Sequence, residues 1–320
     1  LDRTLAFEPR HLPALMMKAD HFASVGDGRA ALSFYQAAER SAPPLQALPP
    51  RLRSEVERAG LMRRNYAREF SDHLEEAAAK ARAAGSSARF DQAIDLLTGR
   101  RTLFLQEPSA FYFPELPQRQ FYERDEFPWL AALEAEIDAI AGELLAVLRA
   151  DRGLRPYVRT TSARPPKDFG GLADDLSWSV FFLIEDVVVE DAARRCPRTL
   201  AALEPVPLAR TPGRTPSVLF SILKPGTRIA PHHGMVNTRL ICHLPLIVHE
   251  GCALRVGNAT RSWRRGETLI FDDTVEHEAW NLSGDLRTVL LFDIWRPELT
   301  LAERDMVSAV LQAVGSFGSA

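Results

Sequence analysis

Arg287-Thr-Val-Leu-Leu-Phe-Asp-Ile-Trp295 is an apolar run, closed by Arg296 and Pro297, that is typical of a β-strand. Four other stretches in the second half of the chain have the same character, bounded by Gly, Pro, Asn or Asp: Ser217 to Leu223, Arg239 to Val248, Ala253 to Val256 and Glu267 to Phe271. Several short strands with turn signals, and no helices between them, indicate a β-sandwich or barrel. The block from Trp178 to Pro297 is therefore expected to carry the β-fold.

The first half of the chain has a helical period instead. Apolar residues recur at helical spacing from Leu12 to Ala23 and from Gly28 to Arg40, and Asp27 is placed to cap the second helix. Two such helices followed by Pro43-Pro44 resemble one tetratricopeptide repeat, although one repeat cannot bury its own apolar face without a neighbour. We expect a helical, tetratricopeptide-like region over residues 1–100, which is a candidate surface for a protein partner.

More helices are expected between this region and the β-block. They run from about Arg51 to Ala84, from Phe90 to Leu97 and from Trp129 to Arg149, with an extended aromatic anchor at Phe111–Pro117. The predicted fold class is thus α+β, with bracing helices and a barrel over residues 101–320.

Composition excludes several classes of protein. The 320 residues are 46% hydrophobic and 25% charged, and a formal net charge of −3 offers no basic footprint for nucleic acid. No apolar run reaches the 18 residues of a transmembrane span, and the first residues do not form a secretory signal. Three cysteines are too few for a disulfide framework, so the cytoplasm is the expected location. The chain starts without Met, so we expect it to begin inside a longer protein.

Two histidine positions and one arginine form the candidate site. His232 and His233 lie in a predicted turn after one strand, and His277 lies 45 residues later, just past another strand end. Neutral imidazoles suit iron, copper or zinc. Arg287 opens an apolar strand, so it needs an anionic partner if it points inward, and a guanidinium pairs a carboxylate through two parallel hydrogen bonds. This pattern is what an oxygenase needs to hold iron and a dicarboxylate cosubstrate.

Four motifs between Trp178 and Leu299 are more specific. They are Ser221-Ile-Leu-Lys-Pro-Gly-Thr-Arg-Ile-Ala-Pro-His-His-Gly234, Asn237-Thr-Arg-Leu-Ile-Cys-His-Leu244, Leu269-Ile-Phe-Asp-Asp-Thr-Val-Glu-His-Glu-Ala-Trp280 and Asp293-Ile-Trp-Arg-Pro-Glu-Leu299. Together they resemble the catalytic domain of the aspartyl/asparaginyl β-hydroxylase family. Bacterial members with tetratricopeptide-like N-terminal regions are similar to the whole chain.

The resemblance implies a double-stranded β-helix, or jelly roll, that works as an iron(II)- and 2-oxoglutarate-dependent hydroxylase. It implies β-hydroxylation of Asp or Asn side chains in a peptide or protein. It implies that His232 and His277 bind the iron and that Arg287 binds the distal carboxylate of 2-oxoglutarate. It also implies that the cosubstrate is contacted by Ser221, His243 and Trp178. The family lacks the usual carboxylate two residues after the first histidine, and Gly234 stands there in this chain. Ile241 replaces a further basic residue of some relatives.

Other interpretations stay open at this point. Relatives of this fold hydroxylate lipid A acyl chains, so an acyl or other small-molecule substrate is one alternative. A non-catalytic helical-repeat binding protein is another, although the intact His232, His277 and Arg287 argue against it. Asp272 and Asp273 could ligate a metal, but Asp is also common where a strand ends in a turn. No side chain is assigned as a general acid or base.

Overall fold

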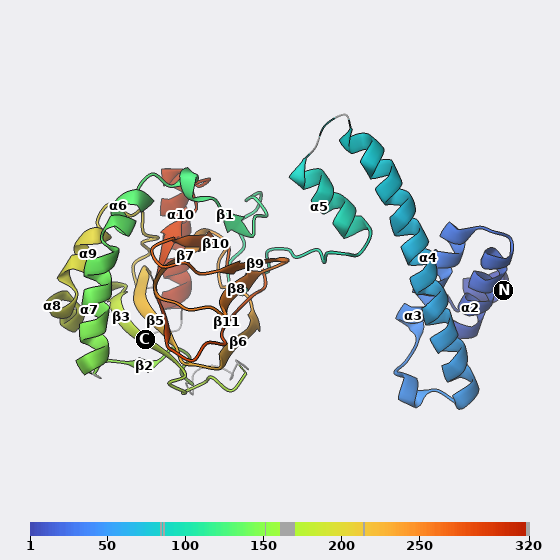
Figure 1. Ribbon diagram of the computed structural model, residues 1–320, viewed down its shortest axis with the longest axis horizontal. Coiled ribbons are helices and arrows are strands. Elements are labelled where there is room, and N and C mark those ends of the chain that lie inside the picture. Colours follow the sequence, from blue (N-terminus) through green and yellow to red (C-terminus); the bar gives the residue numbers. More distant parts are fainter. Residues whose placement is uncertain (84, 86, 151, 161–169, 214, 318–320) are drawn as a thin grey trace. The chain divides into compact units, whose positions relative to one another are not determined.

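Two antiparallel sheets face each other in the second half of the chain (Figure 1). The structure is a computed structural model that describes residues 1–83, 85, 87–150, 152–160, 170–213 and 215–317. It divides the chain into two compact units, Leu1–Thr102 and Leu103–Ala320. The sequence had placed this boundary between residues 100 and 101.

Within the described residues, eight strands form the larger sheet, in the order β1-β10-β7-β12-β5-β3-β2, with β4 paired to β3. The bounds are β1 Phe121–Tyr122, β2 Arg155–Pro156, β3 Trp178–Glu185, β4 Val187–Val188, β5 Ser217–Leu223, β7 Arg239–Ile247, β10 Leu269–Phe271 and β12 Arg287–Trp295. The smaller sheet has the order β6-β11-β8-β9. Its bounds are β6 Thr227–His232, β8 Cys252–Val256, β9 Ala259–Ser262 and β11 His277–Asn281. Two facing antiparallel sheets confirm an α+β fold with a barrel-like β-domain.

The two-residue period of the strands sorts their side chains into two cores. Along β12, Val289 packs in the core between the sheets, whereas Leu290 and Phe292 pack in the core on the outer face of the larger sheet. Helices α6 (Leu130–Ala135), α7 (Ile137–Ala150), α8 (Glu190–Arg195) and α9 (Pro197–Ala202) supply residues to this outer core, as Figure 1 shows for α7 beside β3 and β5. β12 is buried on both faces for this reason.

The expected helix from Trp129 to Arg149 is broken in two. Glu136 leaves the helical backbone conformation, with φ −88° and ψ 9°, and separates α6 from α7. Its carboxylate accepts a hydrogen bond from Arg198 of α9 at 2.6 Å. The prediction of one continuous helix was therefore wrong, while the prediction that this segment braces the barrel is confirmed by the outer core.

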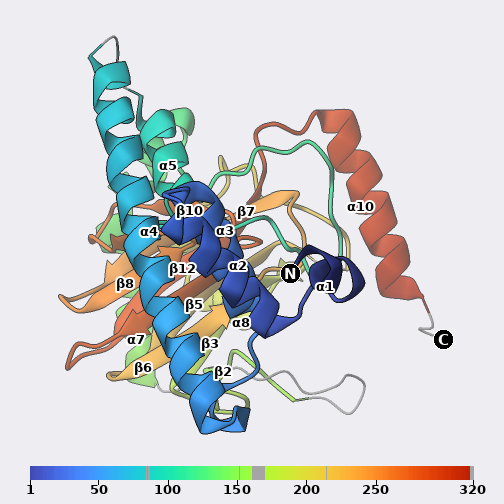
Figure 2. The ribbon, with the colours of Figure 1, turned by 90° about the vertical axis from the view of Figure 1, so that its right-hand side faces the viewer.

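Helix α10 (Leu301–Ser316) follows β12 and was not expected from the sequence. Figure 2 shows it as a separate rod beside the sheets, and Val307 and Leu311 pack it against Trp295 and Leu299. Its start carries a capping box in which Thr300 and Glu303 bond to each other's backbone N–H groups. That Thr-x-x-Glu spacing was the available sequence signal.

The first unit is helical, with α1 Asp2–Phe7, α2 Leu12–Ser24, α3 Gly28–Ser41, α4 Pro50–Arg82, α5 Ala88–Leu97 and the short 3-10 turn η1 Leu45–Ala47. Asp27 caps α3 as predicted, since its carboxylate accepts the N–H of Ala30 at 2.9 Å. The apolar face of the α2–α3 pair is covered by α4, which contributes Ala59 to their shared core. Because α4 is one long helix of 33 residues, the tetratricopeptide likeness stays limited to the α2–α3 pair. No helix in the described part of the chain has both the length and the apolarity to cross a membrane.

Candidate active site

His232 and His277 face each other across the smaller sheet. His232 ends β6, His277 begins β11, and the two residues are direct partners in the strand register. Their ring centroids lie 4.0 Å apart. The prediction of a turn at His232 was wrong, because strand pairing extends β6 to include it, whereas His277 lies past the end of β10 as expected and begins the next strand. Both residues belong to regular strands, so sheet hydrogen bonding holds their backbones in place.

Backbone carbonyls select the same tautomer in both rings. His232 Nδ1 lies 2.8 Å from the carbonyl of Ala230, and His277 Nδ1 lies 3.1 Å from the carbonyl of Val275. A carbonyl only accepts, so each Nδ1 carries the proton and each Nε2 carries the lone pair. Burial lowers the pKa of both rings, that of His277 well below its ordinary value, which keeps them neutral near pH 7. Two neutral imidazoles oriented by a second hydrogen bond suit a first-row metal.

The carboxylate of Asp272, near His277 in the sequence, is bonded to other residues of the protein. Asp272 is fully buried and ion-paired to Arg296 at 2.8 Å, and it also accepts hydrogen bonds from Gln106 and Thr274. These bonds give Asp272 a structural role and leave no reason to assign it as a metal ligand. In the part of the chain that the structure describes, no group of three or more His, Cys, Asp or Glu side chains is arranged to hold a metal ion. The histidine pair, His232 and His277, is therefore the candidate metal centre.

Gly234 has no room for a side chain. A Cβ atom built at this position would lie 2.2 Å from Oδ2 of Asp273, far inside van der Waals contact. Burial raises the pKa of Asp273 to about 7, and its Oδ2 lies 3.7 Å from Arg239 Nη2. The Asp273 carboxylate thus fills the space in which a ligand at position 234 would stand.

We expect Gly234→Ala to lower the free energy of unfolding by about 1–3 kcal/mol, the usual cost of overpacking, and to weaken metal binding. Metal binding should weaken because Asp273 would be displaced, and Asp273 belongs to the loop that positions His277. Thermal unfolding and metal titration would measure the two effects. Gly234→Ala combined with Asp273→Ala should recover stability, and Gly284→Ala, which meets nothing within 4 Å, is the control. If Gly234→Ala were as stable as Gly284→Ala, the packing argument would be wrong.

Arg287 is a buried cation without an anion. It is 1% exposed, its Nε and Nη1 have no hydrogen-bond partner, and among the described residues no carboxylate lies within ion-pair distance of it. Burial lowers its pKa to about 10. An isolated buried charge is costly, so Arg287 is a candidate to bind an anionic ligand that would supply the missing negative charge. Arg287 does point inward, which is the condition under which the sequence analysis assigned it an anionic partner.

Ser221, Trp178, His243 and Arg287 line one cavity of about 820 Å³ together with His232 and His277. Trp178 Nε1 donates to Ser221 Oγ at 3.2 Å, and its ring stacks on Tyr157 with centroids 4.1 Å apart. His243 is buried with Nδ1 unpartnered, and burial together with the nearby Arg287 holds its pKa well below the ordinary value. All six residues proposed from the sequence therefore meet in a single space.

Several cavity residues were not proposed as functional. Arg239 donates to Asp293 at 2.6 Å, and both line the cavity with Asp273 and Tyr157. Arg239 and Asp293 fall inside the sequence motifs, two residues from Ile241 and Trp295 respectively, so alternation along β7 and β12 could have placed them on the inner face. Tyr157 has no comparable sequence signal.

An extended segment, residues 106–113, straps both histidine loops. The N–H groups of Ser109 and Ala110 donate to the carbonyls of Gly234 and Met235, and that of Glu107 donates to Thr274. Phe111 and Phe113 pack on the core that contains Trp295 and Leu299. This confirms the aromatic anchor, and it shows that the anchor contacts the loops beside both candidate ligands.

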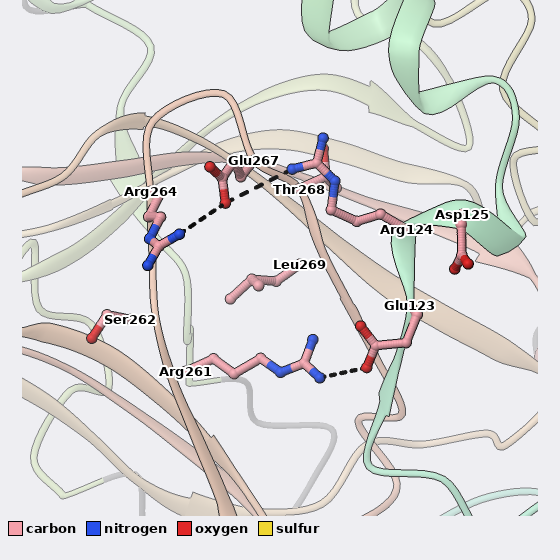
Figure 3. Close-up of a pocket in the computed structure, with 9 residues that line it drawn as sticks. All are labelled: Glu123, Arg124, Asp125, Arg261, Ser262, Arg264, Glu267, Thr268 and Leu269. Atoms are coloured by element: carbon pink, nitrogen blue, oxygen red, sulfur yellow. Dashed lines mark hydrogen bonds and ion pairs between the residues drawn. The ribbon is translucent and has the colours of Figure 1, made fainter.

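A second hollow on the barrel, with a volume of about 780 Å³, lies between residues 123–125 and 261–269, and Figure 3 shows the side chains that line it. Its charges neutralise one another. Arg261 pairs with Glu123 at 2.7 Å, and Arg264 and Arg124 approach Glu267 at 3.8 and 3.9 Å. It offers no surplus charge for a ligand, so the histidine cavity is the better candidate site.

Residues 134–297, about half of the chain, match the family described as aspartyl/asparaginyl beta-hydroxylase. The matched range contains both histidines, Arg287 and all of the residues that line the cavity except Ser109, Leu311 and Gly315. This chain belongs to the aspartyl/asparaginyl β-hydroxylase family. The sequence motifs had indicated this family, and a hydroxylase is the corresponding class of enzyme.

Curated relatives carry two kinds of name. The chain is 37% identical over 163 residues to the mouse (Mus musculus) aspartyl/asparaginyl beta-hydroxylase, covering 50% of this chain and 22% of that protein. It is 36% identical over 189 residues to the ornithine lipid ester-linked acyl 2-hydroxylase of Rhizobium tropici, covering 58% of this chain and 63% of that protein. The chain thus spans less than two thirds of either relative. A cupin 2 barrel protein from Salinispora arenicola aligns at 10% identity and a TM-score of 0.26, over 47% of this chain and 98% of that one.

Proposed function

We propose that the second unit is an iron(II)- and 2-oxoglutarate-dependent hydroxylase. The observation that supports this most directly is one cavity with a neutral histidine pair at one place and an unpaired, buried guanidinium at another. The imidazoles suit iron, and the guanidinium suits the distal carboxylate of a dicarboxylate. His232 and His277 would hold the metal, and Arg287, with Ser221, His243 and Trp178, would hold 2-oxoglutarate.

When bound, iron and 2-oxoglutarate supply the oxidation in which dioxygen hydroxylates a C–H bond and the cosubstrate becomes succinate and carbon dioxide. The protein contributes orientation and exclusion of water. The Ala230 and Val275 carbonyls aim the two Nε2 atoms by holding the Nδ1 protons. Arg287 fixes the far end of the cosubstrate from a water-poor wall of the cavity, where a charged hydrogen bond is stronger than in water.

For the substrate, we propose the β-carbon of Asp or Asn in a peptide or protein, because the mouse relative is named an aspartyl/asparaginyl beta-hydroxylase. An acyl chain is a second candidate, because the Rhizobium tropici relative is named an acyl 2-hydroxylase and apolar residues form part of the cavity lining. Leu311 of α10 and Met235 line the cavity, and α10 exposes Met306, Val310 and Val314.

Succinate formation tests the proposal. Purified protein should convert 2-oxoglutarate to succinate only with iron(II), and faster when its substrate is present. Peptides containing Asp or Asn and vesicles containing ornithine lipid would be compared, with mass spectrometry locating the added oxygen. Iron-independent turnover, or none with either substrate class and no binding of 2-oxoglutarate, would overturn the proposal.

Removing residues 1–97 should spare iron and 2-oxoglutarate binding and uncoupled succinate formation, because the cavity and its strap lie entirely within Leu103–Ala320. Hydroxylation of a large peptide or protein should weaken if the helical unit helps to recognise it. Succinate and hydroxylated product would be measured for both proteins. A folded truncation without cosubstrate binding would show that the helices complete the site. Removal of residues 1–113 is the contrasting variant, and loss of the strap should destabilise both histidine loops.

A further inference from the structure

One aromatic ring accompanies Arg287 where an anion is missing. The guanidinium carbon of Arg287 lies 4.5 Å from the ring centroid of Trp263, within cation–π distance. Trp263 is 5% exposed and also lies 5.9 Å from the ring of His243. It belongs to none of the four sequence motifs, and it follows β9 rather than a strand of the larger sheet.

The strand pairing explains how Trp263 reaches this place. Ser262 pairs with Ala253, so Trp263 comes next to Cys252 at the end of the β8–β9 hairpin. Asn281 pairs with Cys252 and donates to the carbonyl of Leu223, whose register partner on β12 is Arg287. The smaller sheet thereby brings the indole under the arginine. His277 lies four residues from Asn281 along β11, roughly 13 Å away, so this is the end of the barrel remote from the histidines.

The indole N–H does not explain why a tryptophan stands here. Nε1 of Trp263 is buried and has no hydrogen-bond partner, whereas a buried tryptophan usually finds one. The ring face of Trp263, by contrast, contacts the Arg287 guanidinium. An aspartate at this position would stabilise the guanidinium but occupy its N–H donors. A ring face stabilises the positive charge and leaves the in-plane N–H donors available to a ligand.

We propose that Trp263 is a positioning residue for the cosubstrate: its indole face holds the Arg287 guanidinium ready for the distal carboxylate. This inference rests on the proposed function, because the carboxylate is that of 2-oxoglutarate. Trp263 does not line the cavity, so it acts through Arg287 rather than on the ligand.

Calorimetric titration of the full chain with 2-oxoglutarate, with manganese(II) in place of iron, tests the proposal. Trp263→Leu, which keeps apolar volume but no ring, should weaken binding five- to thirty-fold, equivalent to about 1–2 kcal/mol of cation–π energy. Trp263→Phe, which keeps a ring but no N–H, should stay within about threefold of wild type. Trp280→Leu is the matched control, because Trp280 stacks on the exposed Arg228 at 5.2 Å, outside the cavity.

Two further readouts separate positioning from a general loss of structure. With iron, Trp263→Leu should raise the KM for 2-oxoglutarate while kcat at saturation and manganese affinity change little. In an Arg287→Met background, Trp263→Leu should have no further effect on 2-oxoglutarate binding. Equal binding by Trp263→Leu and wild type, or equal losses in Trp263→Leu and Trp263→Phe, would overturn this inference. Failure of wild-type protein to bind 2-oxoglutarate at all would instead overturn the proposed function.

Discussion

Replacing His232 or His277 by Ala is expected to abolish iron-dependent succinate formation and to leave the protein folded. Each ring is neutral, and its Nδ1 is bonded to a local backbone carbonyl, so removing the ring opens a small cavity without leaving a charge unpaired. With two protein ligands proposed, losing one removes half of the protein's hold on the metal. The free energy of unfolding without metal should fall by only about 1–3 kcal/mol, as is usual for single substitutions.

Metal-induced stabilisation is the sharper measurement. A ligand that binds only the folded state raises the unfolding temperature, so wild type should be stabilised by manganese(II) and both Ala variants should not. His249→Ala, on an exposed residue outside the cavity, is the matched control and should respond as wild type does. If both site variants bound metal as tightly as wild type, the histidine pair would not be the metal centre.

Arg287 should show opposite effects on stability and on cosubstrate binding. Arg287→Met removes a buried charge that has no counter-ion among the described residues, so the cosubstrate-free protein should become more stable by at least about 1 kcal/mol. The same variant should bind 2-oxoglutarate roughly tenfold to 100-fold more weakly, since a charged hydrogen bond contributes about 1.5–3 kcal/mol. A residue with a purely structural role would not be expected to give higher stability and weaker 2-oxoglutarate binding when it is replaced.

Arg287→Lys separates charge from geometry. Lysine keeps a positive charge but lacks the planar fork, so the requirement for 2-oxoglutarate should rise at least several-fold. Chemical unfolding without cosubstrate and calorimetric titration with it would measure both effects on the same preparations. Unchanged affinity in both variants would place the carboxylate elsewhere. Lowered stability of Arg287→Met would mean that the contact with Trp263 and the packing of the side chain outweigh the cost of burying the charge.

Strands with strong apolar character were predictable from the sequence alone. Ser217–Leu223 and Arg287–Trp295 have the expected bounds, because each is buried on both faces by the two cores. The strands that carry the metal candidates were not predicted. Thr227–His232 and His277–Asn281 are short and contain polar residues, so their strand conformation depends on pairing with each other and with β8.

The same distinction holds within the site. The sequence by itself determined the family, the histidine and arginine candidates and the helical character of the first unit, because motif spacing and side-chain period are local properties. Only the tertiary structure decided that Asp272 is ion-paired to Arg296 and that the Asp273 carboxylate fills the space beside Gly234. It alone also placed the ring of Trp263 against Arg287. These contacts join residues that different strands and loops bring together. A buried charge or a filled space is defined by all of its neighbours, and those are known only when the sheets have closed on each other.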